Sequence, residues 1–477
     1  MKKLLVGVCA MTACAAGVAT AEDKPTFYKD VLPILQENCQ VCHRPGGANL
    51  GGMVAPMAFT SYEETRPWAK SMAKQVAERN MPPWDASPAQ HGQFNNERTL
   101  TQEQIDTIVR WADSGATRGN STDAPQAREF PDTKGWLIGE PDLILTMPEK
   151  YFVADDVEDI YVDFNQTITT EQLPSDRWIK AIEFHPGSKV VHHIIAFPLG
   201  GIAPGNDPTV YPDGISRKLS PGQDIRWQMH YHKEAGPGTG QWDQSQMAIK
   251  FYPEGADIKY EMQGNSLGRF DFQIPAGDPN YVIQQEYTFN HDSQIIQFLP
   301  HMHVRGKAAK YEAFYPDGSS EVLLEVPQYD FNWQTTYQYK DFKKVPAGTK
   351  IVYTSSWDNS AENPYNPDPT KTVHWGEPTT DEMSFGYMSF INDSGENEQM
   401  FGGGRRGGRG GGGGPALVNL IGMFDKNADG MLQKDEAPGQ MAQFFDRIDQ
   451  NKDGSIDKTE AAAADKARRR QTEQPSL

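Results

Sequence analysis

The chain has few cysteines and none to spare for a disulfide. It contains four in 477 residues, and Cys9 and Cys14 lie in an apolar N-terminal stretch. Only Cys39 and Cys42 remain beyond that stretch, and both belong to a single short motif. A chain with this cysteine usage depends on packing and bound metals for its stability rather than on disulfides.

Long apolar runs and basic residues are also scarce. Beyond the N-terminus no apolar run approaches the roughly 20 residues that span a bilayer, so we expect no transmembrane segment. The 45 Lys and Arg are outnumbered by 64 Asp and Glu, and the formal net charge is −19. This charge argues against a nucleic-acid partner, whose phosphates it would repel.

The N-terminus has the features of a secretory leader. Two lysines precede an apolar run at residues 4–18, and Ala19-Thr20-Ala21 offers a small-residue cleavage site. We therefore predict a signal peptide at 1–21 and a periplasmic or secreted protein. Cleavage before Cys14, which would give a lipid anchor, is disfavoured because Met11 fits the required pattern poorly.

The pattern of polar and apolar residues changes several times along the chain. These changes predict a multidomain, mainly β protein. A helical part, opened in its last segment by a capping Thr101, gives way to short alternating strands, then a glycine-rich stretch and a short helical unit. The strand-rich part is too long for one compact sandwich, so we predict two β-domains. The clearest predicted strands are Ile160–Phe164, Val190–Phe197, Met247–Phe251, Ile295–Leu299 and the hairpin of Tyr311–Phe314 with Val322–Val326. The expected divisions are a signal peptide (1–21), an all-α unit (22–120), a linker (121–142), two β-domains (143–265 and 266–398), a Gly-rich linker (399–415), a small α unit (416–464) and a tail (465–477).

Cys39, Cys42 and His43 form a C-x-x-C-H motif in the N-terminal helical unit. Two cysteines at this spacing add to the two vinyl groups of one porphyrin, and the adjoining imidazole binds its iron. The motif predicts one covalently attached c-type haem and a cytochrome c-like domain. The alternative, a zinc or redox C-x-x-C site, lacks a second ligand pair nearby.

The other axial position of the iron needs a thioether or an imidazole. We predict Met81, within Asn80-Met81-Pro82-Pro83-Trp84, because the prolines hold the backbone extended and let the sulfur reach the iron from a loop. The other candidates are Met53, Met57, Met72 and His91. A haem with Met and His ligands carries electrons and does not activate oxygen.

Six histidines fall in three short groups on predicted strands. The groups are His192-His193, His230 with His232, and His301 with His303. Residues i and i+2 share one face of a strand, so each H-x-H pair can bind one metal ion. Adjacent histidines point to opposite faces and converge only at a twist or bulge. Three such groups together predict metal binding.

Residues 143–398 resemble the copper type II, ascorbate-dependent monooxygenases, the family of peptidylglycine α-hydroxylating and dopamine β-monooxygenases. The resemblance rests on the V-H-H, Q-M-H-Y and H-x-H segments and on Thr380-Asp381-Glu382-Met383, in that order. That family has two jelly-roll β-sandwiches with one copper ion each. The resemblance implies that the electron-transfer copper is bound by His192, His193 and His230. It also implies that the catalytic copper, where dioxygen reacts, is bound by His301, His303 and Met383.

The ligand types suit this chemistry, because imidazoles bind both oxidation states of copper and a methionine sulfur favours Cu(I). His232 departs from the single histidine expected in its group. We assign it no ligand role, and it is the alternative that could compete with His230. His185, His291 and His374 have no partner by spacing. Of these three, His374 is the best candidate to support a ligand, because it closely precedes Met383.

The resemblance does not extend to the residues that bind the substrate in peptide-amidating members of the family. Peptide-amidating members hold a substrate carboxylate with an Arg, an Asn and a Tyr, and the corresponding residues here are Leu299, Phe385 and Tyr387. Without the cation the bidentate carboxylate clamp is lost. The substrate expected at Phe385 and Tyr387 is therefore a neutral or aromatic small molecule rather than a glycine-extended peptide.

Two acidic loops near the C-terminus match the calcium-binding pattern of EF-hands. The pattern places oxygen ligands at loop positions 1, 3, 5, 7 and 12, and a glycine permits the sharp turn. The predicted ligands are Asp425, Asn427, Asp429, Met431 and Glu436 in the first loop, and Asp449, Asn451, Asp453, Ser455 and Glu460 in the second. Only one short helix fits between the loops, so we expect a structural or docking role rather than calcium sensing.

These patterns together predict an exported copper-dependent monooxygenase that hydroxylates a C–H bond of a small organic substrate with O₂. An external electron donor would supply electrons through the attached haem, and the tether gives that carrier a high effective concentration. The alternative is a non-oxygenating electron-transfer or copper-handling protein of the periplasm. A third hypothesis is a calcium-anchored surface protein whose metal core is degenerate.

Overall fold

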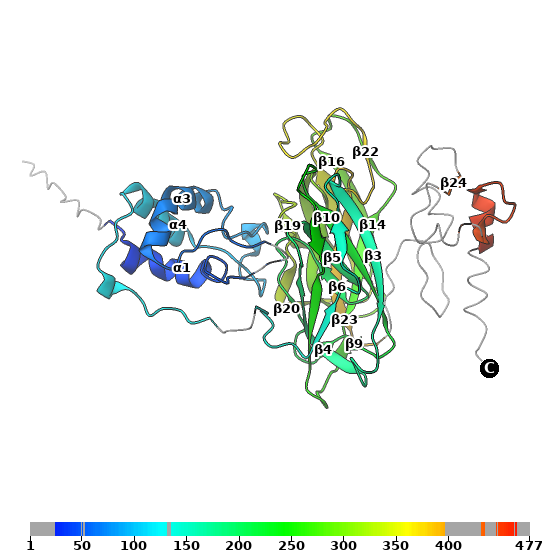
Figure 1. The fold of residues 1–477 in the computed structure, drawn as a ribbon, viewed down its shortest axis with the longest axis horizontal. Helices are drawn as coiled ribbons and strands as arrows, with labels where there is room; N and C mark the ends of the chain where they lie inside the picture. The colour runs from blue at the N-terminus through cyan, green and yellow to red at the C-terminus, as the bar shows by residue number, and fades with distance from the viewer. Residues whose placement is uncertain are drawn as a thin grey trace, which may run out of the picture.

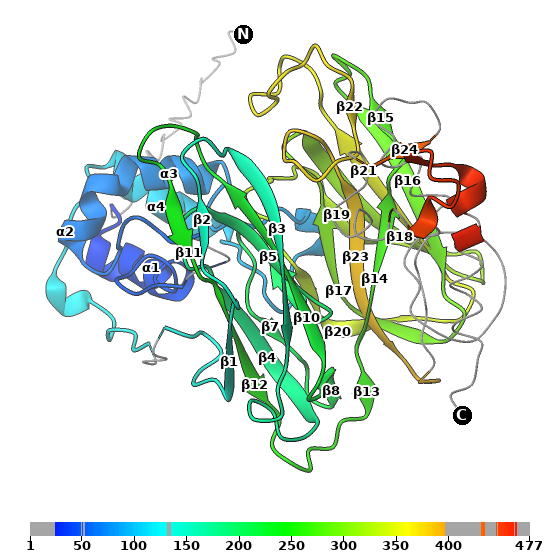
Figure 2. The same cartoon turned by 45° about the vertical axis from the view of Figure 1, so that its right-hand side comes forward.

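The computed structural model describes residues 24–48, 50, 53–130, 135–395, 431–434, 445, 447–461 and 463–464. They form an N-terminal helical unit, a larger body of β-sheets and a small C-terminal part (Figures 1 and 2). The prediction of a mainly β protein is confirmed. Within the described ranges, no helix is long and apolar enough to cross a membrane. The predicted signal peptide (1–21) and Gly-rich linker (399–415) lie outside these ranges.

Short helices around a core of their own make up the N-terminal unit, drawn in blue in Figure 1. Phe27, Ile108 and Trp111 are fully buried in this core. The last helix begins at the predicted cap: Thr101 Oγ1 accepts from the Gln104 backbone N–H, and Gln104 Oε1 accepts from the Thr101 N–H. The helices are η1 (Phe27–Val31), α1 (Leu32–Asn38), α2 (Tyr62–Thr65), η2 (Arg66–Trp68), α3 (Ala69–Ala77), η3 (Pro88–Gln90), α4 (Gln102–Asp113) and η4 (Ser121–Asp123).

The first half of the β body consists of two sheets around one apolar core, which we call the first sheet pair. One sheet has the order β1-β12-β4-β7 with β9 beside β4, and the other has the order β3-β10-β5-β6. Ile194, Trp227 and Met229 fill the core between them. The strands are β1 (Leu143–Thr146), β2 (Tyr151–Val153), β3 (Asp159–Thr167), β4 (Arg177–His185), β5 (Val191–Phe197), β6 (Gly200–Ile202), β7 (Thr209–Val210), β8 (Ile215–Ser216), β9 (Lys218–Leu219), β10 (Asp224–His232), β11 (Gln241–Asp243), β12 (Gln246–Phe251) and β13 (Tyr260–Glu261).

The second half repeats this arrangement as the second sheet pair. Its sheets have the orders β14-β23-β17-β20 and β16-β21-β18-β19, and Phe298, Tyr311 and Phe390 are buried between them. The strands are β14 (Gln263–Arg269), β15 (Gln273–Ile274), β16 (Tyr281–Thr288), β17 (Ser293–His301), β18 (Gly306–Phe314), β19 (Ser320–Val326), β20 (Tyr337–Val345), β21 (Lys350–Trp357), β22 (Val373–His374) and β23 (Ser384–Asn392). Every strand predicted above is present, and each is part of a longer strand or nearly coincides with one.

The two sheet pairs meet through an apolar contact. Ile296 and Ile391, from the second pair, are buried in the core cluster of the first. Ile296 is the extra residue of a bulge in β17, where the pairing with β23 shifts between Ile295 and Gln297. Because a bulge turns one side chain to the other face of its strand, Ile296 reaches across to the first pair.

The helical unit docks on the second sheet pair through residues 84–98. Trp84 and Phe94 are buried in the core of the second pair, and Phe94 forms a β-bridge with Tyr339 in β20. The Ser87 backbone N–H donates to the carbonyl of Glu325 at 2.8 Å. The helical unit and the β body are therefore fixed against each other by backbone bonds as well as by apolar burial.

The C-terminal part contains a short two-stranded sheet. Strands β24 (Leu432–Gln433) and β25 (Ser455–Ile456) pair antiparallel, with Leu432 opposite Ile456. Each strand lies within one of the two predicted calcium loops. The pairing therefore joins the loops.

Candidate metal centres

A bulge in β5 brings His192, His193 and His230 together. The pairing of β5 with β10 places His193 opposite His230 and Val191 opposite Tyr231, so His192 is the extra residue. This is the irregularity predicted for two adjacent histidines that converge. One ring nitrogen from each histidine lies within 4.8 Å of the other two.

The ring nitrogens of this group are arranged as they would be around a cation. Nε2 of His230 lies 3.0 Å from Asp159 Oδ1, so it donates its hydrogen there and Nδ1 keeps a lone pair. That Nδ1 is 3.2 Å from Nδ1 of His193. Nδ1 of His192 is buried and has no hydrogen-bond partner. A buried nitrogen without a partner, beside two nitrogens in contact, fits a metal ion bound by imidazoles.

Burial keeps these rings neutral. Desolvation, with a smaller contribution from the neighbouring histidines, lowers the pKa of His192 to about 3 and that of His193 well below its usual value. Burial also lowers the pKa of His230, and the hydrogen bond to Asp159 opposes that shift. Neutral imidazoles have the free lone pair that a metal ligand needs.

A second group lies at the end of β17, where the ring centroids of His301 and His303 are 5.3 Å apart. Nδ1 of His301 donates to Gln334 Oε1 at 2.6 Å, and Nδ1 of His303 donates to the carbonyl of Asp381 at 3.2 Å. Each bond fixes the tautomer and leaves Nε2 for a metal. Burial lowers the pKa of His301 to about 4, so this ring is also neutral at pH 7.

Met383 lies next to residues that contact this group. It directly precedes β23, whose Phe385 pairs with His301, and it follows Asp381 and Glu382, which both bond His303. The approach of its sulfur to the two histidines stays a prediction. The buried carboxyl group of Glu382 fixes this junction, because its oxygens accept from the backbone N–H groups of His303 and Arg305 at 2.9 and 2.6 Å. Burial raises the pKa of Glu382 to about 8.

The two histidine groups meet on either side of Phe331, a half-buried residue in the loop between β19 and β20. Its ring stacks on His192 with centroids 4.8 Å apart, and its centroid is 5.9 Å from that of His303. The groups therefore lie at the junction of the two sheet pairs. Their proximity is also evident electrostatically, because both His301 and His303 contribute to the lowered pKa of His193.

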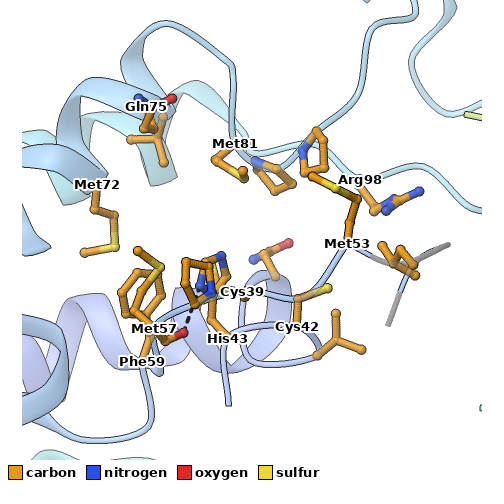
Figure 3. Close-up of a pocket in the computed structure, with 18 of the residues that line it drawn as sticks. Cys39, Cys42, His43, Met53, Met57, Phe59, Met72, Gln75, Met81 and Arg98 are labelled. Carbon is orange, nitrogen blue, oxygen red and sulfur yellow. Dashed lines mark hydrogen bonds between the residues drawn. The ribbon is translucent and has the colours of Figure 1, made fainter. Parts of the chain in front are cut away.

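The C-x-x-C-H motif lies on the wall of a cavity of about 550 Å³ in the helical unit (Figure 3). Nδ1 of His43 donates to the carbonyl of Met57 at 3.2 Å, which leaves Nε2 for a metal. Burial raises the pKa of the Cys39 thiol to about 12 and also raises that of Cys42. The cavity is mostly apolar, and its size and the adjacent imidazole are compatible with the predicted porphyrin.

The structure bears on the candidates for the second axial ligand of the predicted haem. Met81 faces His43 across the cavity in Figure 3, and the other predicted methionines also line it. His91 is exposed and is absent from the cavity lining among the residues described. Met81 therefore stays the predicted ligand, and His91 is removed from the alternatives.

The second calcium loop is described in full. Asp449 Oδ2 accepts from the Gly454 N–H at 3.0 Å, and Glu460 Oε1 accepts from the Asn451 N–H at 3.0 Å. Asp449 Oδ1 is buried and has no hydrogen-bond partner, which is consistent with a cation ligand. Of the ligands predicted in the first loop, only Met431 falls within the described residues. The remaining predicted ligands, Asp425, Asn427, Asp429 and Glu436, lie outside them.

The other singled-out histidines have other contacts. His232 binds Asp159 Oδ2 at 3.3 Å through Nδ1 and lies outside the His192 group. His185 stacks on Trp136, with ring centroids 3.6 Å apart, and binds Glu183. His374 is exposed, so the expectation that its side chain supports a buried ligand is not met.

The predicted substrate residues lie beside His301. The rings of Phe385 and Tyr387 stack with centroids 5.6 Å apart, and their centroids are 6.3 and 6.4 Å from that of His301. Phe270 extends this aromatic group, because its ring contacts both Phe385 and Trp375. Tyr387 is 36% exposed, so the group reaches the surface.

Sequence reasoning did not find the residues that hold the ligands in place. Asp159, Gln334 and Glu382 each bond a predicted ligand, and Phe331 separates the two groups. None of them has a spacing relation to the histidines that a sequence pattern would reveal. In the sequence, Glu382 stands out only as part of the Thr380–Met383 segment, and its hydrogen bonds to the backbone of His303 and Arg305 have no sequence signal.

No protein-family model matches the chain, and no curated protein matches it. Among solved structures, the chain is weakly similar to the infectious bursal disease virus VP2 subviral particle, at 7% identity over 53% of this chain and 72% of that chain, with a TM-score of 0.18. It is also weakly similar to the empty top component of cowpea mosaic virus, at 11% identity over 49% of this chain and 76% of that chain, with a TM-score of 0.20. Likenesses this low carry no argument about this protein.

Proposed function

We propose that the protein is an exported copper-dependent monooxygenase that hydroxylates a C–H bond of a small organic molecule with O₂. The observation that carries the proposal is the meeting of two histidine groups around Phe331, each with its ring nitrogens prepared for a metal. His192, His193 and His230 would bind the copper that receives electrons. His301, His303 and Met383 would bind the copper where oxygen reacts, within jelly-roll sandwiches of the resembled family's type.

The donor sets fit copper. Buried neutral imidazoles bind both Cu(I) and Cu(II), and a thioether stabilises Cu(I), the state that reacts with O₂. Copper would supply one-electron redox chemistry and activate oxygen. The protein's own residues orient the imidazoles: Asp159 holds His230, Gln334 holds His301, and the Asp381 carbonyl holds His303.

The N-terminal unit is proposed to be a c-type cytochrome domain. Cys39 and Cys42 would hold the porphyrin, with His43 and Met81 as axial ligands in the cavity of about 550 Å³. A small redox protein or reductant outside the cell membrane would reduce this haem. The predicted leader at 1–21 supports that location.

The substrate is proposed to be a neutral molecule with an aromatic or similarly flat apolar part. Phe385 and Tyr387 present stacked rings beside His301, where such a part would find aromatic contacts. Leu299 pairs with Tyr387 across the sheet, and at this position an arginine would be needed for a carboxylate clamp.

The C-terminal loops are proposed to bind calcium as an EF-hand-like pair. The buried, unpartnered Asp449 Oδ1 and the pairing of β24 with β25 support this assignment. Calcium would order this part of the chain, with a structural or docking role. The oxygenase proposal does not depend on it.

Isotope-labelled O₂ tests the proposed reaction. The full-length protein, loaded with haem and copper and reduced without air, is mixed with labelled O₂ and a panel of small aromatic compounds. We expect one labelled oxygen atom in a hydroxylated product. His303→Ala and Met383→Ile should abolish product while the haem spectrum is unchanged, and His374→Ala, which changes an exposed histidine, should keep wild-type product levels. Undiminished product in the two ligand variants would refute the assignment.

A protein that only transfers electrons or handles copper is the second candidate. The observation that favours it is Phe331 itself, whose ring occupies space between the two histidine groups. In that case copper and haem would exchange electrons, and O₂ consumption would give no labelled organic product. The same experiment separates the two candidates.

A further inference from the structure

The loop between β19 and β20, residues 327–336, touches both the haem cavity and the histidine groups. Trp333 lines the cavity together with Cys42. Two residues earlier, Phe331 contacts His192 and His303. One short stretch of chain therefore connects two sites that belong to different structural units.

On the cavity side, Trp333 is held by close packing. A Cβ atom placed on Gly205 would lie 2.7 Å from Cε3 of Trp333, so the indole rests directly on a glycine backbone. The Gly205 N–H donates to the carbonyl of Leu50 at 2.9 Å, and Leu50 also lines the cavity. The indole is thus fixed at the point where the helical unit meets the first sheet pair.

On the histidine side, the loop makes two separate contacts. Phe331 stacks on His192 with an interplanar angle of 15°, and Gln334 accepts the hydrogen of His301 Nδ1 at 2.6 Å. Gln334 also ties the loop together, because its side-chain amide donates to the carbonyl of Phe331 at 3.2 Å. Its backbone N–H donates to the carbonyl of Pro204 at 3.0 Å. These bonds give the loop one conformation.

We propose that this loop is the electron path from the haem to the copper sites, with Trp333 as entry and Phe331 as exit. The inference rests on the proposed function. With both groups bound, one electron would pass from the ferrous haem, which would become ferric, to one Cu(II), which would become Cu(I), with no proton transferred and no bond formed or broken. The external one-electron donor would then reduce the haem again. Phe331 also contacts the second group through His303, so the path reaches both metal sites.

The physical reason is the distance dependence of electron tunnelling. The rate falls steeply at each gap between non-bonded atoms, and bonded segments and packed aromatic rings reduce the number and width of such gaps. Trp333 and Phe331 are joined through the backbone, so the gaps lie only at the cavity wall and at the His192 stack. The other aromatic contacts across this interface, those of Trp84 and Phe94, lead to Tyr337 and Tyr339 in the core of the second sheet pair.

Rapid kinetics on the full-length protein tests the path. The haem- and copper-loaded protein receives one electron at the haem from a photochemical reductant without air. Reoxidation of the haem is followed by its absorption, and the loss of Cu(II) by electron paramagnetic resonance. We expect Trp333→Leu and Phe331→Leu each to slow haem-to-copper transfer by about tenfold or more. Trp333→Phe, which keeps an aromatic ring, should retain most of the rate.

Trp242→Leu is the matched control, because this tryptophan is 64% exposed and packs on Phe152 in the ribbon of β2 and β11. Its rate should equal that of the wild type. Haem content, copper content and haem reduction potential are measured for every variant, so that a change in rate is not a change in loading. Wild-type rates in both Trp333→Leu and Phe331→Leu would overturn the path and leave the proposed function intact. Failure of the wild-type protein to bind copper would overturn both.

Discussion

Asp159 holds two histidines and joins the two sheet pairs. Its Oδ1 accepts from His230 at 3.0 Å, and its Oδ2 lies 3.3 Å from His232 Nδ1 and 2.9 Å from the hydroxyl of Thr379 in the second pair. Burial opposes ionisation, but the hydrogen bonds from His230 and His232 outweigh it and hold the pKa of Asp159 well below its usual range. The carboxylate therefore stays charged and keeps Nδ1 of His230 free for a metal.

Replacing this carboxylate should weaken the proposed copper site of His192, His193 and His230 without removing a ligand. We expect Asp159→Asn to lower the copper affinity of the His192, His193 and His230 site by about 10–100-fold, the usual cost of losing a partner that orients a histidine. A chelator competition assay on the haem-loaded protein measures this. Asp163→Asn, on the same strand but in a surface pair with Arg226, is the control and should bind as the wild type does. Equal affinity in Asp159→Asn and Asp163→Asn would show that Asp159 has no such role.

The sequence reveals the candidate metal ligands better than it reveals the residues that orient them. His301 and His303 are two residues apart, and their common strand face follows from that spacing. Asp159 lies 71 residues from His230, and Gln334 lies 33 residues from His301. Contacts across such separations arise only from the folded sheets, so neither carries a local signal.

Among the single elements, the strands are predicted well by the alternation of polar and apolar residues. The predicted strands are present, and the bulge that adjacent histidines require is located at His192. The docking of residues 84–98 on β20 was not predicted. The reason is that Trp84 and Phe94 contribute to a core assembled from distant strands, which lie between residues 263 and 392. The sequence of a helical unit does not show which sheet it will cover.

Calcium binding by the second predicted loop can be tested with a single substitution. We expect the full-length protein to bind Ca²⁺ and Asp449→Ala to lose the site formed by the second loop, because a buried carboxylate at loop position 1 is removed. Calorimetric titration with Ca²⁺ measures the stoichiometry. Gln450→Ala, at the exposed loop position 2, which supplies no ligand, should bind as the wild type does. Identical titrations for Asp449→Ala and the wild type would exclude calcium at this loop.

At the scale of the whole molecule, three units converge on one junction. The first sheet pair contributes His192, His193 and His230, and the second contributes His301 and His303. The helical unit is fixed to the second pair by backbone hydrogen bonds, and its cavity opens toward Trp333. The chain has a net charge of −19 and no cysteine outside its predicted leader and its C-x-x-C-H motif. It gains stability here from burial and, in our proposal, from bound metals.

The copper content of the haem-loaded, full-length protein is the most direct test of the central claim, which is that the junction contains two separate copper sites. After copper reconstitution and dialysis, elemental analysis should give two copper ions per chain for the wild type. His230→Ala and His303→Ala should each retain one, because each removes a ligand from a different group. A wild-type protein that binds no copper, or a His230→Ala, His303→Ala double variant that still binds two ions, would contradict the account.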